Sequence, residues 1–195
     1  LTSVDGELNI LMGIRDQLRP DVKNHLQKLK ALRVKNLIVL SGDNQSTVDK
    51  VAKELGLTEA YGNMLPQDKS QFIRKLQENG HKVAFVGDGV NDSPSLALAD
   101  IGIAMGGGTD VAIETSDVVL MNSDFSRLPH ALGLAKATAR NMIQNIVIAV
   151  GVVLFLLANV FFSEWMNMSI GMLVHEASIF VVILNGMRLL GYKSR

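Results

Sequence analysis

The chain has 195 residues, in which 19 Lys and Arg balance 19 Asp and Glu, and it contains no cysteine. The balanced charge gives no overall attraction for nucleic acid or for acidic partners, and the lack of cysteine excludes a disulfide framework and thiolate metal ligands. Nearly all the charged residues lie before residue 141, so the composition divides the chain into a charged part and an apolar part. The sequence begins without an initiator Met or a signal peptide, which favours a piece of a longer protein.

Short apolar runs alternate with amphipathic helical patterns over the first 125 residues. This alternation is typical of an α/β fold with a parallel sheet covered on both faces. The predicted strands are 8–12, 36–40, 82–86, 101–104 and 118–121. The predicted helices are 20–32, 45–55 and 67–78, and glycines at 56 and 80 would end the last two.

Polar runs follow two of the predicted strands where each strand ends. Ser-Gly-Asp-Asn at 41–44 follows the strand at 36–40, and Gly-Asp-Gly-Val-Asn-Asp at 87–92 follows the strand at 82–86. Reactive groups in an open α/β sheet gather beyond the carboxyl ends of its strands. Parallel neighbouring strands would therefore bring four side chains to one edge of the sheet: Ser41, Asp43, Asp88 and Asp92.

The chemistry of this edge favours a site for magnesium and phosphate. Clustered carboxylates among small residues suit Mg²⁺, and the glycines let backbone amides approach phosphate oxygens. Lys69, at the start of the third helix, would supply a compensating positive charge. Taken singly, a Gly-Asp pair after a strand is more often a turn or a helix cap, and a lysine near a helix start is more often solvated. The complete run Gly-Asp-Gly-x-Asn-Asp-x-Pro at 87–94 favours the site.

Four motifs together resemble a known family. They are Ser-Gly-Asp-Asn at 41–44, Leu-Pro-Gln-Asp-Lys at 65–69, Gly-Asp-Gly-Val-Asn-Asp-Ser-Pro at 87–94 and Ala-Asp-Ile-Gly-Ile-Ala-Met-Gly at 99–106. They are similar to motifs of the phosphorylation domain of P-type ATPases, which has a haloacid-dehalogenase-like fold. The resemblance covers residues 1–126 and implies a parallel sheet with flanking helices.

The resemblance implies a role for each residue at this edge. Ser41 would contact the phosphoryl group, at a position where the family more often has threonine, and Lys69 would neutralise the charge of that group. Gly42 and Asp43 belong to the same catalytic loop as Ser41. By the resemblance, Asp88 and Asp92 would be ligands of Mg²⁺. Asn91, together with Asp92, would support the metal and the phosphate.

One departure from the family concerns activity. The family's nucleophile lies in an Asp-Lys-Thr-Gly-Thr motif, and this motif does not occur here. The nucleotide-binding domain and the Thr-Gly-Glu loop are missing as well. Because covalent catalysis needs its nucleophile, we expect the chain alone not to hydrolyse ATP. What the sequence retains is a half-site for Mg²⁺ and phosphate.

Two apolar segments follow, in a C-terminal region at 127–195. The run 146–162 contains no charge, and the spans are predicted at 146–162 and 168–190. Each is long enough for the roughly 30 Å core of a bilayer. A helix from 127 to about 145 would continue into the first span and link it to the sheet. The turn between the spans contains Trp165, and Lys or Arg flank both open ends, for example at Lys136 and Arg188. This pattern predicts a multi-pass protein of the cell membrane with the charged domain and the C-terminus in the cytoplasm. The alternatives are a plain anchor or a buried helical hairpin of a soluble protein.

His175 and Glu176 are the ionisable residues within the second span before Arg188. An ionisable side chain in a membrane tends to be retained where an ion or a partner compensates its cost, so the pair is a candidate transport site, and Ser178 shares a helix face with His175. Imidazole and carboxylate suit Zn²⁺, Co²⁺ or Fe²⁺. Methionines at 166, 168, 172 and 187 leave copper as an alternative transported metal, although Met is more often an ordinary apolar side chain of such helices. Asparagines at 141, 145 and 159 share a face of the first span, where they would line an ion path or, as we favour, form hydrogen bonds between helices.

A helical hairpin with His-Glu in its last helix resembles the heavy-metal branch of P-type ATPases. The resemblance implies ATP-driven export of zinc, cadmium or cobalt through an aspartyl-phosphate intermediate, with Mg²⁺ as cofactor and ATP as substrate. The expected partners are the transported metal ion, the lipid bilayer and upstream parts of the same pump, without nucleic acid. The run His-Glu-Ala-Ser at 175–178 stands where a glycine-rich stretch ending in threonine is more usual, which leaves the metal open. The alternatives are a copper-transporting ATPase, a membrane-anchored phosphatase of the same superfamily and a truncated chain without catalysis.

Overall fold

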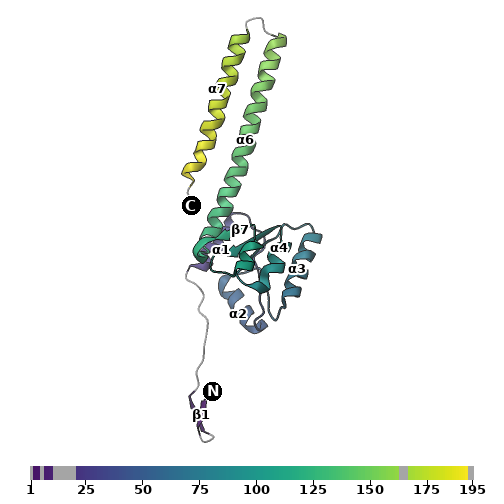
Figure 1. Cartoon of the computed structure of the whole chain (residues 1–195), viewed down its shortest axis with the longest axis vertical. Coiled ribbons are helices and arrows are strands. Elements are labelled where there is room, and N and C mark those ends of the chain that lie inside the picture. Colours follow the sequence, from purple (N-terminus) through teal and green to yellow (C-terminus); the bar gives the residue numbers. More distant parts are fainter. Residues whose placement is uncertain (1, 5–6, 11–20, 163–166, 193–195) are drawn as a thin grey trace.

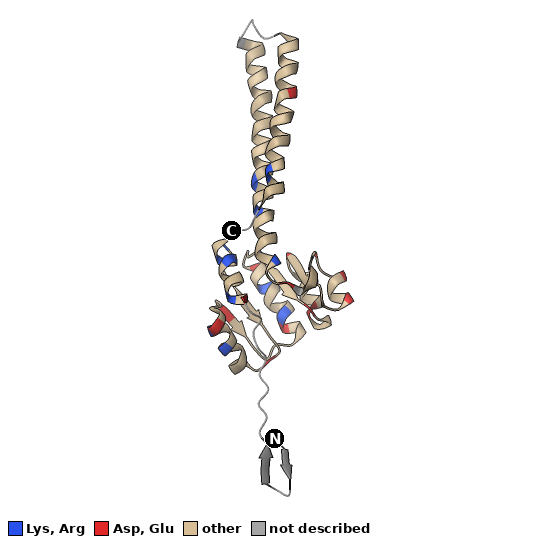
Figure 2. Ribbon diagram, turned by 90° about the vertical axis from the view of Figure 1, so that its left-hand side faces the viewer, with Lys and Arg blue, Asp and Glu red and all other residues tan. Residues whose placement is uncertain are grey.

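The computed structural model describes residues 2–4, 7–10, 21–162 and 167–192. An α/β part carries a long helical hairpin, as Figure 1 shows. Lysines, arginines and acidic residues gather on the α/β part, while most of the hairpin lacks them (Figure 2). The expected division into a charged part and an apolar part is therefore visible in the structure.

The strands form three separate sheets among the described residues. β1 (Thr2–Val4) pairs antiparallel with β2 (Glu7–Ile10), and β3 (Ile38–Leu40) pairs parallel with β4 (Glu59–Tyr61). β5 (Ala84–Gly87), β6 (Ile101–Met105) and β7 (Val118–Leu120) form a three-stranded parallel sheet in that order. The prediction that the strands before the two polar runs are neighbours is wrong, because β3 pairs with β4 and β5 pairs with β6.

Three strands differ from the expectation in further ways, and one of them is β1, which was not predicted. The strand expected at 8–12 is found at 7–10 in an antiparallel pair, and positions 11 and 12 lie outside the described residues. β4 was not predicted, because three residues between two helices are too short for a pattern to show.

The three predicted helices are confirmed. α1 covers Val22–Ala31, α2 covers Gln45–Leu55 and α3 covers Pro66–Glu78. Asn44 caps α2 by accepting a hydrogen bond from the Ser46 amide at 2.9 Å, and Gly56 ends it with a φ of 66°. The short helices α4 (Ser93–Leu98) and α5 (Asp110–Glu114) and the 3₁₀ turns η1 (Val90–Asp92) and η2 (Met121–Ser123) were not predicted.

One buried cluster joins the α/β part to the hairpin. Its centre consists of Leu26 and Leu29 of α1 and of Leu37, which precedes β3. Leu128 and Leu132, from the first turns of the long helix that follows η2, pack against this centre. That helix, α6, runs without a break over Arg127–Phe162. Because its first turns belong to the core of the α/β part, the apolar remainder of α6 extends directly from that core.

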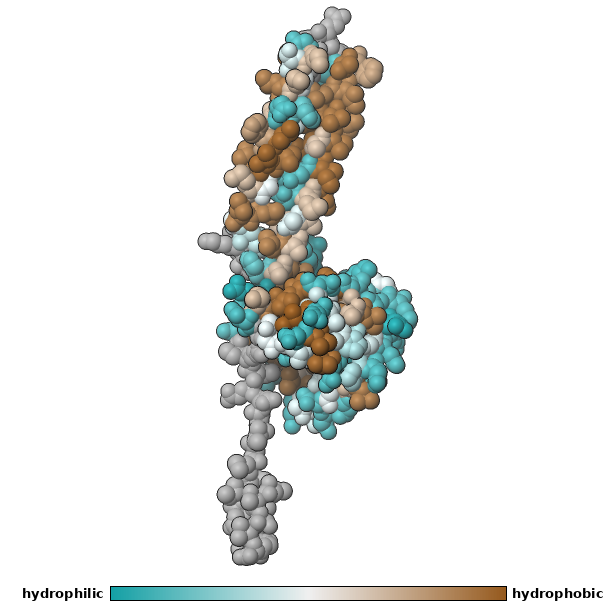
Figure 3. All heavy atoms as spheres, in the orientation of Figure 1, coloured by the Kyte–Doolittle hydropathy of each residue, from teal (hydrophilic) through white to brown (hydrophobic). Residues whose placement is uncertain are grey.

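The hairpin consists of α6 and α7 (Met168–Met187), followed by the 3₁₀ turn η3 (Arg188–Gly191). Both helices are long and apolar enough to cross a membrane, and none of their most apolar stretch is buried. Figure 3 shows hydrophobic surface over the hairpin and largely hydrophilic surface over the α/β part. Side chains such as Leu154 and Phe161 are exposed, which counts against a buried hairpin of a soluble protein. The residues of the predicted turn lie outside the described residues, except Asn167, which caps α7.

Candidate functional site

Two carboxylates and one lysine meet where β5 ends. Asp88 follows the strand directly, and Asp92 is the last residue of η1. The Lys69 ammonium of α3 donates to Asp92 Oδ1 at 2.8 Å, and each of these two side chains is 15% exposed. In the described part of the chain, the Asp88 carboxylate has no hydrogen-bond or ion-pair partner and is exposed. One carboxylate is thus neutralised and the other is available for a ligand.

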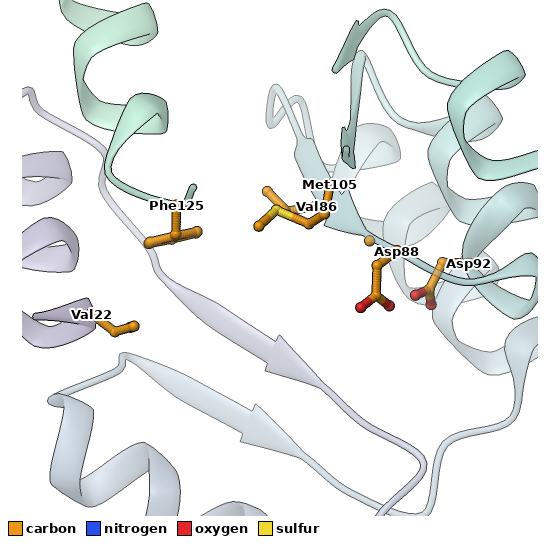
Figure 4. A pocket seen from close by; sticks show the side chains of 7 residues that line it. Val22, Val86, Asp88, Asp92, Met105 and Phe125 are labelled. Atoms are coloured by element: carbon orange, nitrogen blue, oxygen red, sulfur yellow. The ribbon is translucent and has the colours of Figure 1, made fainter. Parts of the chain in front are cut away.

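A cavity of about 320 Å³ opens beside these carboxylates. Asp88 and Asp92 lie together at one end of it, Val22 and Phe125 lie at the other, and Val86 and Met105 lie between (Figure 4). The cavity therefore has an acidic end and an apolar end.

Two glycines allow the backbone to come close to these carboxylates. A Cβ atom at Gly87 would lie 2.7 Å from the Cβ of Asp92, and one at Gly108 would lie 2.5 Å from the carbonyl oxygen of Asp88. The amide of Thr109 also donates to that carbonyl at 3.0 Å. The loop at 106–109 thus holds the backbone of Asp88. Gly108 and Thr109 were not predicted as part of the site, although three consecutive glycines at the end of a strand are a signal for a close backbone approach.

The loop after β3 is organised by its own hydrogen bonds. The hydroxyl of Ser41 donates to Asp43 Oδ2 at 3.0 Å and accepts from the Asp43 amide at 3.1 Å. The amide of Met64 donates to the Ser41 carbonyl at 3.0 Å, and the amide of Asn63 donates to the Asp43 carbonyl at 2.6 Å. This loop is therefore bound to the segment that leads from β4 into α3, the helix that carries Lys69.

Gln45 strengthens this connection and was also missed. Its Oε1 accepts from the Gly62 amide at 2.6 Å, and its Nε2 donates to the Ala60 carbonyl at 3.1 Å. A side chain at Gly62 would collide with Gln45, since a Cβ there would lie 2.6 Å from the Gln45 Cα.

Not every predicted site residue meets at the cavity. Asp88 and Asp92 line the cavity and Lys69 contacts Asp92, whereas neither Lys69 nor the loop at 41–43 lines the cavity. Asn91 is exposed on η1 and does not line the cavity either.

The donor set at this edge fits Mg²⁺. The described residues contain no group of three or more His, Cys, Asp or Glu that could enclose a metal ion. Mg²⁺ is usually bound through one or two carboxylates together with waters and substrate phosphates. Asp88 and Asp92 supply the two carboxylates, and the cavity beside them leaves room for the other ligands.

In the hairpin, the predicted metal ligands all lie on α7. His175 and Glu176 are exposed, and the Ser178 hydroxyl donates to the His175 carbonyl of its own helix at 2.6 Å. The asparagines of α6 do not hydrogen-bond to any of these three residues. Asn141 instead donates to the Asn185 carbonyl of α7 at 2.7 Å, and Asn145 accepts from the Asn185 side chain at 2.8 Å, so the predicted hydrogen bonding between helices is confirmed for these two asparagines. It is wrong for Asn159, which donates to the Phe155 carbonyl of its own helix at 2.8 Å, and a shared polar path with His175 is not seen among the described residues.

Comparison with known proteins shows similarity along most of the chain. The Zinc-transporting ATPase of Bacillus subtilis (strain 168) is 42% identical over 187 residues, which are 95% of this chain and 29% of that protein. Copper-transporting ATPase 1 of Rhizobium meliloti (strain 1021) is 42% identical over 74% of this chain and 17% of its own length. The chain thus spans less than a third of the length of these relatives.

A solved structure extends the similarity to the whole architecture. The crystal structure of a zinc-transporting PIB-type ATPase in the E2.Pi state matches 90% of this chain and 28% of that one, with 38% identity and a TM-score of 0.81. The resemblance to heavy-metal P-type ATPases is thereby confirmed, together with the fold of parallel sheets and helices followed by two apolar helices. The family model described as haloacid dehalogenase-like hydrolase matches residues 2–100, just over half of the sequence, and the chain therefore belongs to the haloacid dehalogenase-like hydrolase family.

Proposed function

We propose that this chain is part of an ATP-driven pump that exports a divalent heavy-metal cation, namely zinc, cadmium or cobalt, through an aspartyl-phosphate intermediate. The observation that carries the proposal is the group formed by Lys69, Asp92 and Asp88 at the end of β5, in an α/β part whose core contains the first turns of a membrane-length helix. Coupling of phosphorylation to transport requires contact between the phosphate site's domain and a membrane helix, and the shared core supplies such a contact.

The residues of the α/β part would divide the chemistry as follows. Asp88 and Asp92 would hold Mg²⁺, which supplies positive charge to the phosphate oxygens when it is bound. Lys69 would add a second positive charge at the same place, because its ammonium lies 2.8 Å from Asp92. The Ser41 hydroxyl, which donates to Asp43 Oδ2 in this structure, would instead donate to the phosphoryl group when that group is bound, with Gly42 beside it and Asn91 supporting the magnesium site. The aspartate that accepts the phosphoryl group would come from outside these 195 residues, since no Asp-Lys-Thr-Gly-Thr run occurs in them.

In the membrane, His175 and Glu176 would contribute ligands to the transported ion, with Ser178 on the same face as His175. Their exposure on the surface of α7 leaves them available to further helices of the pump. Their imidazole and carboxylate groups favour Zn²⁺ or Co²⁺ over Cu(I). The positively charged residues at the open ends of the hairpin favour a cytoplasmic α/β part.

The phosphate half of the proposal is tested in a complete pump that contains this segment. We expect Asp88→Asn to abolish formation of the phosphoenzyme from ATP and Mg²⁺. Asp21→Asn, an exposed aspartate just before α1, is the matched control and should be phosphorylated normally. Normal magnesium-dependent phosphorylation of Asp88→Asn would contradict the proposal.

The transport half is tested by His175→Ala in the same pump. The variant should lose stimulation of ATPase activity by the metal and should still be phosphorylated by inorganic phosphate. A panel of Zn²⁺, Cd²⁺, Co²⁺ and Cu(I) on the unmodified pump distinguishes the copper-transporting alternative. ATP turnover that is independent of every metal in the panel would instead favour a membrane-anchored phosphatase.

A further inference from the structure

Side-chain amides from both helices meet at the end of the hairpin nearer the α/β part. Asn141 donates to the Asn185 carbonyl at 2.7 Å, and Asn185 donates to Asn145 Oδ1 at 2.8 Å and, at 3.4 Å, to Gln144 Oε1. Asn145 donates in turn to Asn141 Oδ1 at 3.2 Å, and Arg188 donates to Asn185 Oδ1 at 3.0 Å. We call these five residues the asparagine cluster.

The asparagine cluster supplies every hydrogen bond between α6 and α7 that the described residues contain. Asn141 is 8% exposed, so its amide is buried between the helices. Lipid is as apolar as the facing helix, so helices in a membrane associate through van der Waals packing and interhelical hydrogen bonds. The asparagine cluster supplies the directional contacts between α6 and α7, and these favour one register of α7 on α6.

α6 is also attached to the α/β part close to this point, and the segment after α7 packs against the first turns of α6. Leu128 and Leu132 hold α6 in the core, and the Lys136 ammonium donates to the Leu32 carbonyl at the end of α1. Beyond α7, the ring of Tyr192 lies against that of His130, with centroids 5.6 Å apart. The base of the hairpin and the α/β part thus form one continuous packed body.

We propose that the asparagine cluster is a positioning device for the transport site: it holds α7 on α6, so that movement of the α/β part reaches the helix that carries His175 and Glu176. The inference rests on the function proposed above for those two residues. Asn185 and His175 are ten positions apart on α7, which is about 15 Å along a helix. A change of register at the asparagine cluster therefore displaces His175 and Glu176 by a similar amount, because one helix carries all of these residues.

The first test measures the register directly in this 195-residue chain. The chain has no cysteine, so Leu154→Cys on α6 and Leu173→Cys on α7 provide two exposed sites for spin labels. In lipid nanodiscs, the label-to-label distance should have one narrow distribution. Asn185→Ala should broaden or shift it, whereas Asn159→Ala should not, because Asn159 bonds only to the Phe155 carbonyl of its own helix. Equal distributions for the two alanine variants would overturn the inference.

The second test separates positioning from folding in a complete pump. Asn185→Ala should reduce metal-stimulated ATPase activity at least tenfold while phosphorylation by inorganic phosphate stays within twofold. Asn159→Ala should leave both activities unchanged. Asn145→Ala removes the α6 partner of the same contact and should reproduce the split. If both cluster variants also lose phosphorylation by inorganic phosphate, the asparagine cluster serves folding alone and the inference is wrong.

The outcomes also distinguish this inference from the proposed function. A pump whose unmodified form shows no metal stimulation contradicts the proposed function, and the distance measurement then still decides whether the asparagine cluster sets the register. An unmodified pump with metal stimulation, together with an Asn185→Ala variant that retains it, contradicts the positioning role alone.

Discussion

At Gly87, a single added methyl group should disturb the candidate site directly. An alanine there would place its Cβ 2.7 Å from the Cβ of Asp92 and 3.0 Å from Asp92 Oδ2. Carbon atoms in contact prefer about 3.5 to 4.0 Å, so Asp92 or the strand must move by roughly 0.8 Å. The movement would separate Asp92 from Lys69, which now lie 2.8 Å apart.

The size of the effect follows from the geometry. Overfilling a packed site costs about 1 to 3 kcal/mol, and we expect Gly87→Ala to lower the free energy of unfolding by about 2 kcal/mol. A misplacement of about 1 Å can cost on the order of 100-fold in a catalytic site. The affinity for Mg²⁺ in the presence of inorganic phosphate should therefore fall at least tenfold, which corresponds to about 1.4 kcal/mol.

Chemical denaturation in detergent micelles and titration calorimetry with Mg²⁺ and phosphate measure the two quantities. The matched control is Gly151→Ala on α6, where an added Cβ would meet no atom within 4 Å. Because alanine is favoured over glycine in a helix by about 0.5 to 1 kcal/mol, the control should be neutral or slightly more stable. Unchanged stability and Mg²⁺ affinity in Gly87→Ala would refute the reasoning.

Three further predictions concern other parts of the α/β fold. Gly108→Ala should weaken Mg²⁺ binding without changing any charge, because its Cβ would lie 2.5 Å from the Asp88 carbonyl; calorimetry that gives the wild-type affinity would contradict this. Ile73→Ala, at a site 1% exposed, should lower the free energy of unfolding by about 2 to 5 kcal/mol, and a loss below 1 kcal/mol would show that the core does not depend on it. The hydrogen bond from Lys82 is the main cause that lowers the pKa of Asp100 from 3.8 to about 2. Its contribution is complete above about pH 4 and is lost as the pH falls towards 2, so melting temperatures of wild type and Asp100→Asn should converge there; a constant difference would contradict the assignment.

Local patterns in the sequence predicted the helices of the α/β part closely. α2 covers Gln45–Leu55 and ends before Gly56 as expected, because a glycine stop acts on the nearest turn of the helix. The short elements were missed because a local pattern needs several residues to become visible. β4 has three residues and α4 has six, which are too few to show a period of two or of 3.6.

The sheet was predicted less well than the helices. Apolar runs identified the strands, but they carry no information on which strand pairs with which. β3 pairs with β4 and β5 pairs with β6, so the loop at 41–43 lies on one pair and Asp88 on the other. The carboxyl-end rule placed Asp88 and Asp92 at the end of a strand, as the structure has them, but the strand pairing that it assumed was wrong.

By itself, the sequence determined the kinds of group that the chain offers: glycine-flanked carboxylates after a strand, a lysine at a helix start, and two apolar segments with asparagines on one face. Only the tertiary structure decided which of them meet. Lys69 contacts Asp92, which lies 23 positions away in the sequence, and Asn141 contacts Asn185, which lies 44 positions away. The physical reason is that caps and periodicity depend on neighbouring residues, whereas these contacts depend on how sheets and helices pack, and packing is a property of the whole chain.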